Sequence, residues 1–86
     1  GNDLVALGAM RAALELGRRI PDDLALVGGD DILMASQVTP ALTTFRSPKR
    51  EIGIIAAQLL FRRIDGDPEY HEHLYDEELI RRASAP

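Results

Sequence analysis

Residues 24–31, with the sequence LALVGGDD, are the stretch that decides the fold. The stretch begins as an apolar run and ends in two adjacent acids, Asp30 and Asp31, in front of a short helical segment at residues 32–37. In an open parallel α/β sheet, ligands bind beyond the carboxyl ends of the strands. The stretch therefore predicts a buried strand at residues 24–28 that delivers polar side chains to a cleft.

A second polar pair, Asn2 and Asp3, precedes the helical stretch 4–16. Two such pairs at two strand ends indicate one cleft seen from two neighbouring strands, which favours a receptor for a small polar molecule. Asp3 and Asp31 are also good N-cap residues, because a carboxylate accepts hydrogen bonds from the free amides of a first helical turn. We therefore expect Asp3 to cap the first helix and Asp31 to cap the second.

The remaining elements follow from local signals. Gly17 is a natural end for the first helix. Residues 42–46 are β-branched and aromatic, which is typical of extended chain. Pro48 suits the first turn of a third helix that runs to about residue 64, and residues 78–82 can form a last strand. The order α-β-α-β-α-β predicts an α/β fold with a mainly parallel sheet and helices on both faces.

Composition narrows the function classes. The 86 residues make one small domain with a formal net charge of −4, which argues against direct contact with nucleic acid. There is no cysteine, so disulfides and thiol chemistry are excluded, and no apolar run is long enough to cross a membrane. The chain starts without Met beside a helix cap, and we interpret it as a piece of a larger protein.

The first helix has two apolar faces. A helix that lies on a sheet needs only one, so the second face must meet another element or a partner chain, and we favour a partner. One face holds Val5, Ala9, Ala12 and Leu16, and the nearly opposite face holds Leu7, Met10 and Leu14 with Arg11 beside them.

The chain resembles the C-terminal part of a LacI/GalR-family transcriptional regulator over nearly its whole length. Each motif is weak alone, but their order and spacing are specific. One departure is Gly29, where the family usually has an aromatic residue in front of the two acids. The matching residues are Asn2-Asp3, Ala6-x-Gly8, Ala13-x-x-x-Gly17, Ile20-Pro21-x-Asp23, Val27-Gly28-Gly29-Asp30-Asp31, Pro40-x-Leu42-Thr43-Thr44, Pro48, Gly53 and Leu79-Ile80-x-Arg82-x-Ser84.

The resemblance implies a periplasmic-binding-protein-like effector domain of two α/β subdomains. Residues 1–46 and 70–86 would belong to the C-terminal subdomain, and residues 47–69 would carry a helix into the N-terminal subdomain. Thr43 and Thr44 would form the hinge. The DNA-binding part of such a regulator lies at the other end of the protein, which would be a cytoplasmic, allosteric homodimer without a cofactor.

The resemblance also implies the site residues. Asn2 and Asp30 match effector contacts, and their chemistry suits a sugar or nucleoside: Asn both donates and accepts, and an ionised Asp accepts from two hydroxyls. The alternative is that both are turn residues that bond local backbone. The expected dimer interface, for which intrachain core is the alternative, comprises Leu7, Met10, Arg11, Leu14, Gln37 and Val38.

Other functions have less support. A transport-associated sugar-binding protein of the same fold is the main alternative, and a flavodoxin-like enzyme is a further one. We expect no catalysis, because the sequence has no phosphate loop, nucleophile elbow or catalytic triad order. His71 and His73 stand two residues apart, but a third ligand at a convincing spacing is missing, so we expect a solvated connector and no metal site.

Overall fold

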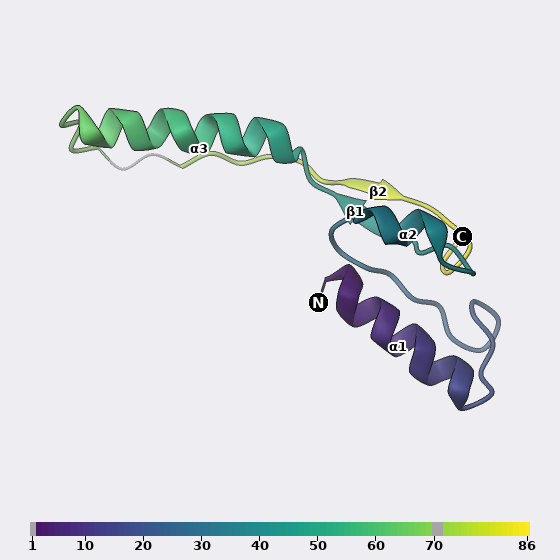
Figure 1. Ribbon diagram of the computed structural model, residues 1–86. Helices are drawn as coiled ribbons and strands as arrows, with labels where there is room; N and C mark the ends of the chain where they lie inside the picture. Colours follow the sequence, from purple (N-terminus) through teal and green to yellow (C-terminus); the bar gives the residue numbers. More distant parts are fainter. Residues whose placement is uncertain (1, 70–71) are drawn as a thin grey trace. The chain divides into compact units, whose positions relative to one another are not determined.

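The computed structural model describes residues 2–69 and 72–86. Along the chain it contains α1 (Asp3–Glu15), α2 (Leu33–Gln37), β1 (Thr44–Arg46), α3 (Lys49–Ile64) and β2 (Glu78–Ile80). Figure 1 shows these five elements in chain order. The chain divides into two compact units, Gly1–Arg46 with Glu78–Pro86, and Ser47–Glu77. The predicted subdomain boundary near residue 70 lies outside the described residues, and the assignment of the two units to subdomains stays a prediction.

The first helix, α1, has a side-chain cap at its start and a glycine just beyond its end. The Asn2 side chain accepts a hydrogen bond from the Val5 amide at 3.0 Å, so Asn2 is the N-cap. Gly17 has φ 74° and stops the helix as predicted, because this left-handed conformation suits glycine. The expectation that Asp3 caps α1 is wrong: Asp3 is the first helical residue and is fully buried.

The core of the first unit is small and lies under one face of α1. It is built from residues on α1, on α2 and just before β1, and further apolar side chains pack around it. The helical face that supplies the core lies between the two faces that the sequence distinguished. The core consists of Ala6, Met10, Ala35 and Leu42, with Leu7, Ile20, Leu26, Ile32 and Val38 packed against it.

The apolar face of α1 that was expected to meet the sheet is exposed. Val5 is 63% exposed and Leu16 is 78% exposed. A hollow of about 200 Å³ lies beside this face. Asn2, Val5, Ala6, Ala9, Leu26 and Val27 line it. An amphipathic pattern alone does not determine the phase of a helix that has two apolar stripes.

The second helix, α2, is one and a half turns long and starts without a side-chain cap. Ile32 occupies the N-cap position. Asp31 was expected there, but its backbone has φ 51°, outside the extended conformation of an N-cap residue. Its carboxylate is directed instead to two arginines, as described below.

The sheet has two strands, and they run antiparallel. Thr44 pairs with Ile80, Phe45 with Leu79 and Arg46 with Glu78 (Figure 1). The strand expected at residues 24–28 is reduced to a single bridge, in which Val27 pairs in parallel with Thr43. The prediction of a mainly parallel sheet is therefore not confirmed, because the chain leaves through β1 and returns through β2, which forces an antiparallel pair.

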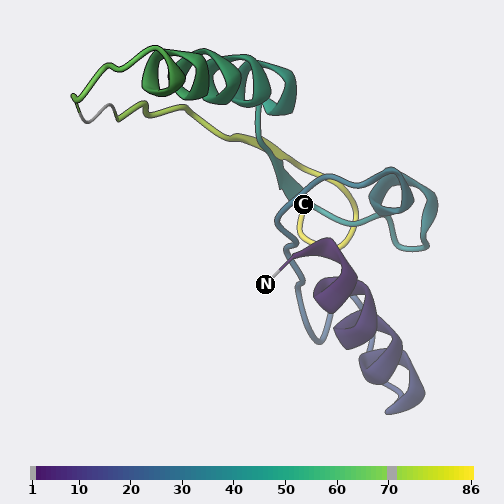
Figure 2. The same ribbon diagram turned by 60° about the vertical axis from the view of Figure 1, so that its left-hand side comes forward.

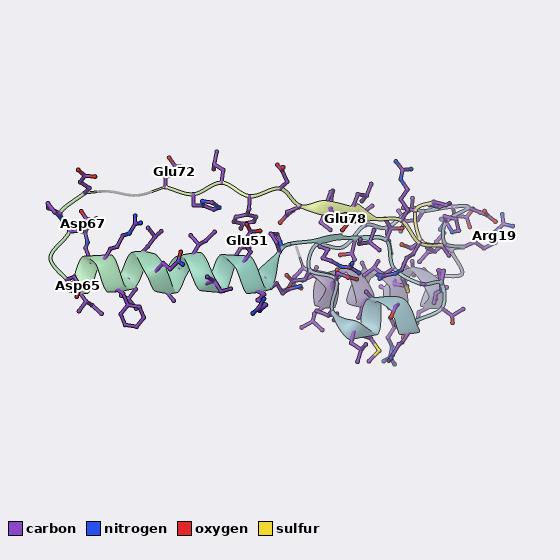
Figure 3. All side chains as sticks on the ribbon, turned by 90° about the horizontal axis from the view of Figure 1, so that it is seen from above. Arg19, Glu51, Asp65, Asp67, Glu72 and Glu78 are labelled. Atoms are coloured by element: carbon purple, nitrogen blue, oxygen red, sulfur yellow. The ribbon has the colours of Figure 1, made fainter. Side chains whose placement is uncertain are left out.

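The second unit consists of α3 and the extended segment that returns beside it. Figure 2 shows this return from a second side. The two ends of the unit are joined by the Ser47 hydroxyl, which donates to Glu77 at 2.8 Å. Glu51 lies in the first turn of α3, and Asp65 and Asp67 lie beyond its far end (Figure 3). Pro48 is the N-cap, so the helix begins where the sequence predicts.

Candidate functional site

The Asp3 carboxylate is the centre of the polar network in the first unit. Its Oδ1 accepts from the Gly29 amide at 2.8 Å and from the Thr44 hydroxyl at 2.6 Å. Its Oδ2 accepts from the Ile32 amide at 2.8 Å. One buried carboxylate thus joins α1, the start of β1 and residues 28–32, which we call the rim loop.

Gly28 is required at the start of the rim loop for a steric reason. A Cβ built on Gly28 would overlap the Asp3 carboxylate and lie 2.9 Å from the Leu42 Cδ2 atom. The carboxylate can therefore reach the amides of the loop only because residue 28 has no side chain. The structure explains one glycine of the Gly28-Gly29 pair in this way.

The network stabilises Asp3 in its ionised form. Burial raises the pKa of Asp3, but hydrogen bonds from the Thr44 hydroxyl and from the amides of Ile32, Gly29 and Asp30 outweigh burial and leave that pKa below its ordinary value of 3.8. Hydrogen bonds to a carboxylate favour its charged form. Asp3 is therefore a structural anion that orders the rim loop.

Asn2 and Asp30, the two expected effector contacts, are the neighbours of this network. The hydrogen bond between Asp3 and Gly29 joins the residue after Asn2 to the residue before Asp30. The Asp30 amide also donates to the Thr44 hydroxyl at 3.1 Å. The sequence thus placed the two polar pairs at one place in the fold, but it missed that Asp3 is the residue that joins them.

Asp30 is not among the residues that line the hollow beside Asn2, which is otherwise apolar. Asn2 also uses its Oδ1 atom to cap α1. Their role in binding an effector remains a prediction.

Asp31 accepts two charge-assisted hydrogen bonds. Its Oδ2 lies 2.7 Å from the Arg46 Nε atom and its Oδ1 lies 2.9 Å from an Arg82 Nη1 atom. Burial raises the pKa of Asp31, but the hydrogen bonds and charges of Arg46 and Arg82 lower it by more than burial raises it. The pKa of Asp31 therefore lies below its ordinary value. The same Arg82 nitrogen also donates to the Leu42 carbonyl at 3.0 Å.

Thr43 and Thr44, the expected hinge, are fully buried and held by their hydroxyl groups. The Thr43 hydroxyl oxygen accepts from the Arg82 amide at 2.7 Å. The Thr43 amide donates to the hydroxyl of Ser84, which in turn donates to the Leu26 carbonyl. Bending at Thr43 or Thr44 would break these bonds. The hinge assigned to Thr43 and Thr44 stays a prediction; within the first unit the two threonines are held by these hydrogen bonds.

The residues expected at a dimer interface differ in exposure. Met10 is only 4% exposed and belongs to the intrachain core, which was the alternative to the dimer interface. Leu7 and Val38 are half-buried against the same core. Leu14 is 50% exposed, and Gln37 is also exposed. Arg11, the sixth of these residues, is exposed and forms an ion pair with Glu15, four residues further along α1, at 3.1 Å.

The family model for a periplasmic binding protein-like domain matches residues 1–85. The chain belongs to this family. Within the family, the resemblance to LacI/GalR-type regulators is confirmed by the relatives and solved structures that the chain is similar to.

Among the relatives of this periplasmic binding protein-like domain is the ribose operon repressor of Halalkalibacterium halodurans. It is 43% identical over 67 residues, which are 78% of this chain and 20% of the repressor. The lac repressor dimer bound to operator and the anti-inducer ONPF is 34% identical with a TM-score of 0.87, over 99% of this chain and 30% of that chain. A LacI family regulator from Enterococcus faecium with bound ribose is 35% identical with a TM-score of 0.82, over 98% of this chain and 32% of that chain.

The chain therefore spans between a fifth and a third of the length of these three proteins. Among the described residues of this periplasmic binding protein-like domain, no group of three His, Cys, Asp or Glu side chains could hold a metal ion. His71 of the predicted histidine pair lies outside the described residues. Within residues 2–69 and 72–86, no helix is long and apolar enough to cross a membrane.

Proposed function

We propose that this chain is the C-terminal part of the effector-binding and dimerisation domain of a LacI/GalR-type transcriptional regulator. The effector is a small sugar or nucleoside-like molecule, and operator DNA binds to another part of the same protein. The regulator is cytoplasmic and binds its effector without turning it over. Residues 1–46 and about 70–86 form its C-terminal subdomain, and residues 47–69 reach its N-terminal subdomain.

The observation that carries this proposal is the hydrogen bond from the Gly29 amide to the Asp3 carboxylate. It ties together the two loop positions that bear Asn2 and Asp30. A carboxylate and an amide at such a position can hold the hydroxyl groups of a sugar, since an ionised carboxylate accepts two hydrogen bonds at once. The ribose-bound relative from Enterococcus faecium supports a sugar as the ligand class.

Effector binding then changes the balance between two arrangements of the regulator. A ligand shifts such a balance only by its difference in affinity for the two arrangements. Coupling of this kind between a ligand site and a DNA site amounts to about 1–3 kcal/mol in typical allosteric proteins. The rim loop suits this role, because it joins the proposed effector contact Asp30 to β1 through the Thr44 hydroxyl.

Calorimetric titration of the complete regulator with D-ribose and a set of other pentoses, hexoses and nucleosides tests the effector site. Replacement Asp30→Ala is expected to weaken binding at least tenfold, because a charge-assisted hydrogen bond contributes about 1.5–3 kcal/mol. Asp22→Ala, which removes an exposed acid elsewhere, is the control and is expected to leave the affinity unchanged. Unchanged affinity of the Asp30→Ala protein would contradict the assigned site.

The second part of the proposal is the homodimer. It uses the exposed leucine face of α1 and the end of α2, with Leu7, Arg11, Leu14, Gln37 and Val38. Leu14→Glu is expected to give monomers in sedimentation, because an unpaired charge buried in an interface costs several kcal/mol. Leu74→Glu, at an 83% exposed position in the second unit, is the control. A Leu14→Glu protein that sediments as the intact dimer would refute this interface.

A further inference from the structure

Asp31 joins segments of the first unit that lie far apart in the sequence. Arg46, which binds its Oδ2 atom, is the last residue of β1. Arg82, which binds its Oδ1 atom, stands two residues after the end of β2. Both oxygens of one carboxylate are thus used, one for the last residue of β1 and one for a residue just beyond β2.

These two strands carry both connections of the chain to the second unit. That unit begins at Ser47, directly after Arg46, and ends at Glu77, directly before β2. Through Arg46 the Asp31 carboxylate holds the point at which the chain leaves the first unit, and through Arg82 it holds the segment just beyond β2, the returning strand.

The two bonds of Asp31 differ in how far they are exposed to solvent. Its side chain is 9% exposed and that of Arg82 is 16% exposed, whereas that of Arg46 is 51% exposed. The bond to Arg82 is therefore shielded from water and strong, and the bond to Arg46 is weaker because solvent screens it. Loss of the Asp31 charge would leave Arg82 partly buried opposite a neutral group.

The backbone of Asp31 ties the same residue to the proposed effector site. Asp31 follows Asp30 directly, and its amide donates to the Thr44 hydroxyl at 3.3 Å. Its φ of 51° is a left-handed conformation that Asp and Asn tolerate better than other residues with side chains. Rotation of the chain at Asp30 would therefore displace the carboxylate that holds both arginines.

We propose that Asp31 is a positioning residue that transmits the state of the effector site to both strands that lead into the second unit. This inference rests on the proposed function for the identity of the effector. The clamp itself, one carboxylate on two arginines, is a property of the first unit and can be tested without an effector. Ligand contacts at Asp30 move the clamp, and the clamp moves β1 and β2 together.

The test is hydrogen exchange of the complete regulator, followed by mass spectrometry of peptides that cover β1, β2 and α1. Asp31→Asn keeps the shape of the side chain and its tolerance of a left-handed backbone, and it removes the charge and one of the two acceptor oxygens. We expect exchange in β1 and β2 to rise at least tenfold, with less than a twofold change in α1, since local opening depends on local bonds. Asp23→Asn, which removes an exposed ion pair with Arg19, is the matched control.

Two further variants separate the arms of the clamp. Arg82→Gln is expected to raise exchange in both strands several-fold more than Arg46→Gln does, because the Arg82 bond is the shielded one. Unchanged strand exchange in Asp31→Asn would overturn the proposal. An equal rise in α1 and in the strands would also overturn it, because Asp31 would then stabilise the unit as a whole.

A measurement with D-ribose tests transmission. Saturating D-ribose is expected to slow strand exchange at least threefold in the unmodified regulator and to have no such effect in Asp31→Asn, while the D-ribose Kd stays within about threefold. Loss of D-ribose binding in Asp31→Asn would overturn the positioning role, since Asp31 would then act as a contact. Absence of binding heat in the unmodified regulator contradicts D-ribose as its effector and leaves the exchange test of the clamp intact.

Discussion

Asp3→Asn is the substitution that tests the polar network most directly. The asparagine has the same shape as the aspartate, but it has one acceptor oxygen in place of two. Asp3 Oδ1 accepts from Gly29 and Thr44, and Oδ2 accepts from Ile32. Whichever way the new amide is turned, its NH₂ group faces a backbone N–H of the rim loop. At least one partly buried donor therefore loses its partner.

The magnitude follows from the bonds that are lost. A hydrogen bond to a charged group contributes about 1.5–3 kcal/mol, and an unsatisfied buried donor costs about 1–3 kcal/mol. We expect the free energy of unfolding to fall by about 3 kcal/mol, which is about a hundredfold in the equilibrium constant. Urea unfolding of the complete effector domain, followed by circular dichroism, measures this change from the shift of the midpoint.

The matched control is Asp22→Asn, which makes the same chemical change at an exposed position in the turn after α1. Such surface substitutions usually change stability by less than about 0.5 kcal/mol. A second control is the double-mutant cycle with Thr44→Val, in which the two effects should be non-additive because the side chains are in direct contact. An Asp3→Asn protein as stable as the Asp22→Asn protein would refute the central role of Asp3.

Two more predictions follow from the same network. Gly28→Ala is expected to lower the free energy of unfolding by about 1–3 kcal/mol, because the new methyl group overlaps the Asp3 carboxylate. Thermal unfolding measures this loss. The control is Gly8→Ala, where the new methyl group would meet no neighbouring atom within 4 Å. Because the pKa values of Asp3 and Asp31 are lowered in the folded state, their contribution to stability is present above the ordinary value of 3.8 and is lost as the pH falls through the folded values. Urea midpoints measured between pH 7 and pH 2.5 should therefore fall below about pH 4, and a smaller fall is expected in Asp3→Asn; identical acid profiles would exclude Asp3 as a source of this dependence.

The sequence was sufficient for features that depend on neighbouring residues. Gly17 predicts where α1 ends and Pro48 predicts where α3 begins, whereas the cap of α1 was assigned to Asp3 and is Asn2. The order of the motifs was sufficient for the family, which the match over residues 1–85 confirms. Capping and periodicity are local interactions, so these features need no knowledge of the tertiary structure.

Features that depend on contacts between distant residues could not be predicted from the sequence alone. Asn2 and Asp3 are both good caps, and only the rim loop, more than twenty residues further on, decides that Asp3 turns inward. Met10 belongs to a third face of α1 that appears once Ala35 and Leu42 pack against it. The sequence contains Gly28, but the reason for that glycine is a carboxylate from another element.

In the proposed mechanism, Asp30 of the rim loop binds the effector, and Asp3 and Asp31 anchor the loop on its two sides. Asp3 holds the backbone of the loop at Gly29 and Ile32, whereas Asp31 holds β1 and β2 through two arginines. Asp30 lies between the residues that make these contacts, and its amide is fixed by the Thr44 hydroxyl. A ligand that pulls on Asp30 therefore acts on a loop that is anchored to α1 on one side and to both connecting strands on the other. Because the first anchor is fully buried and Arg46 at the second is half exposed, displacement is expected to pass to the strands and not to α1.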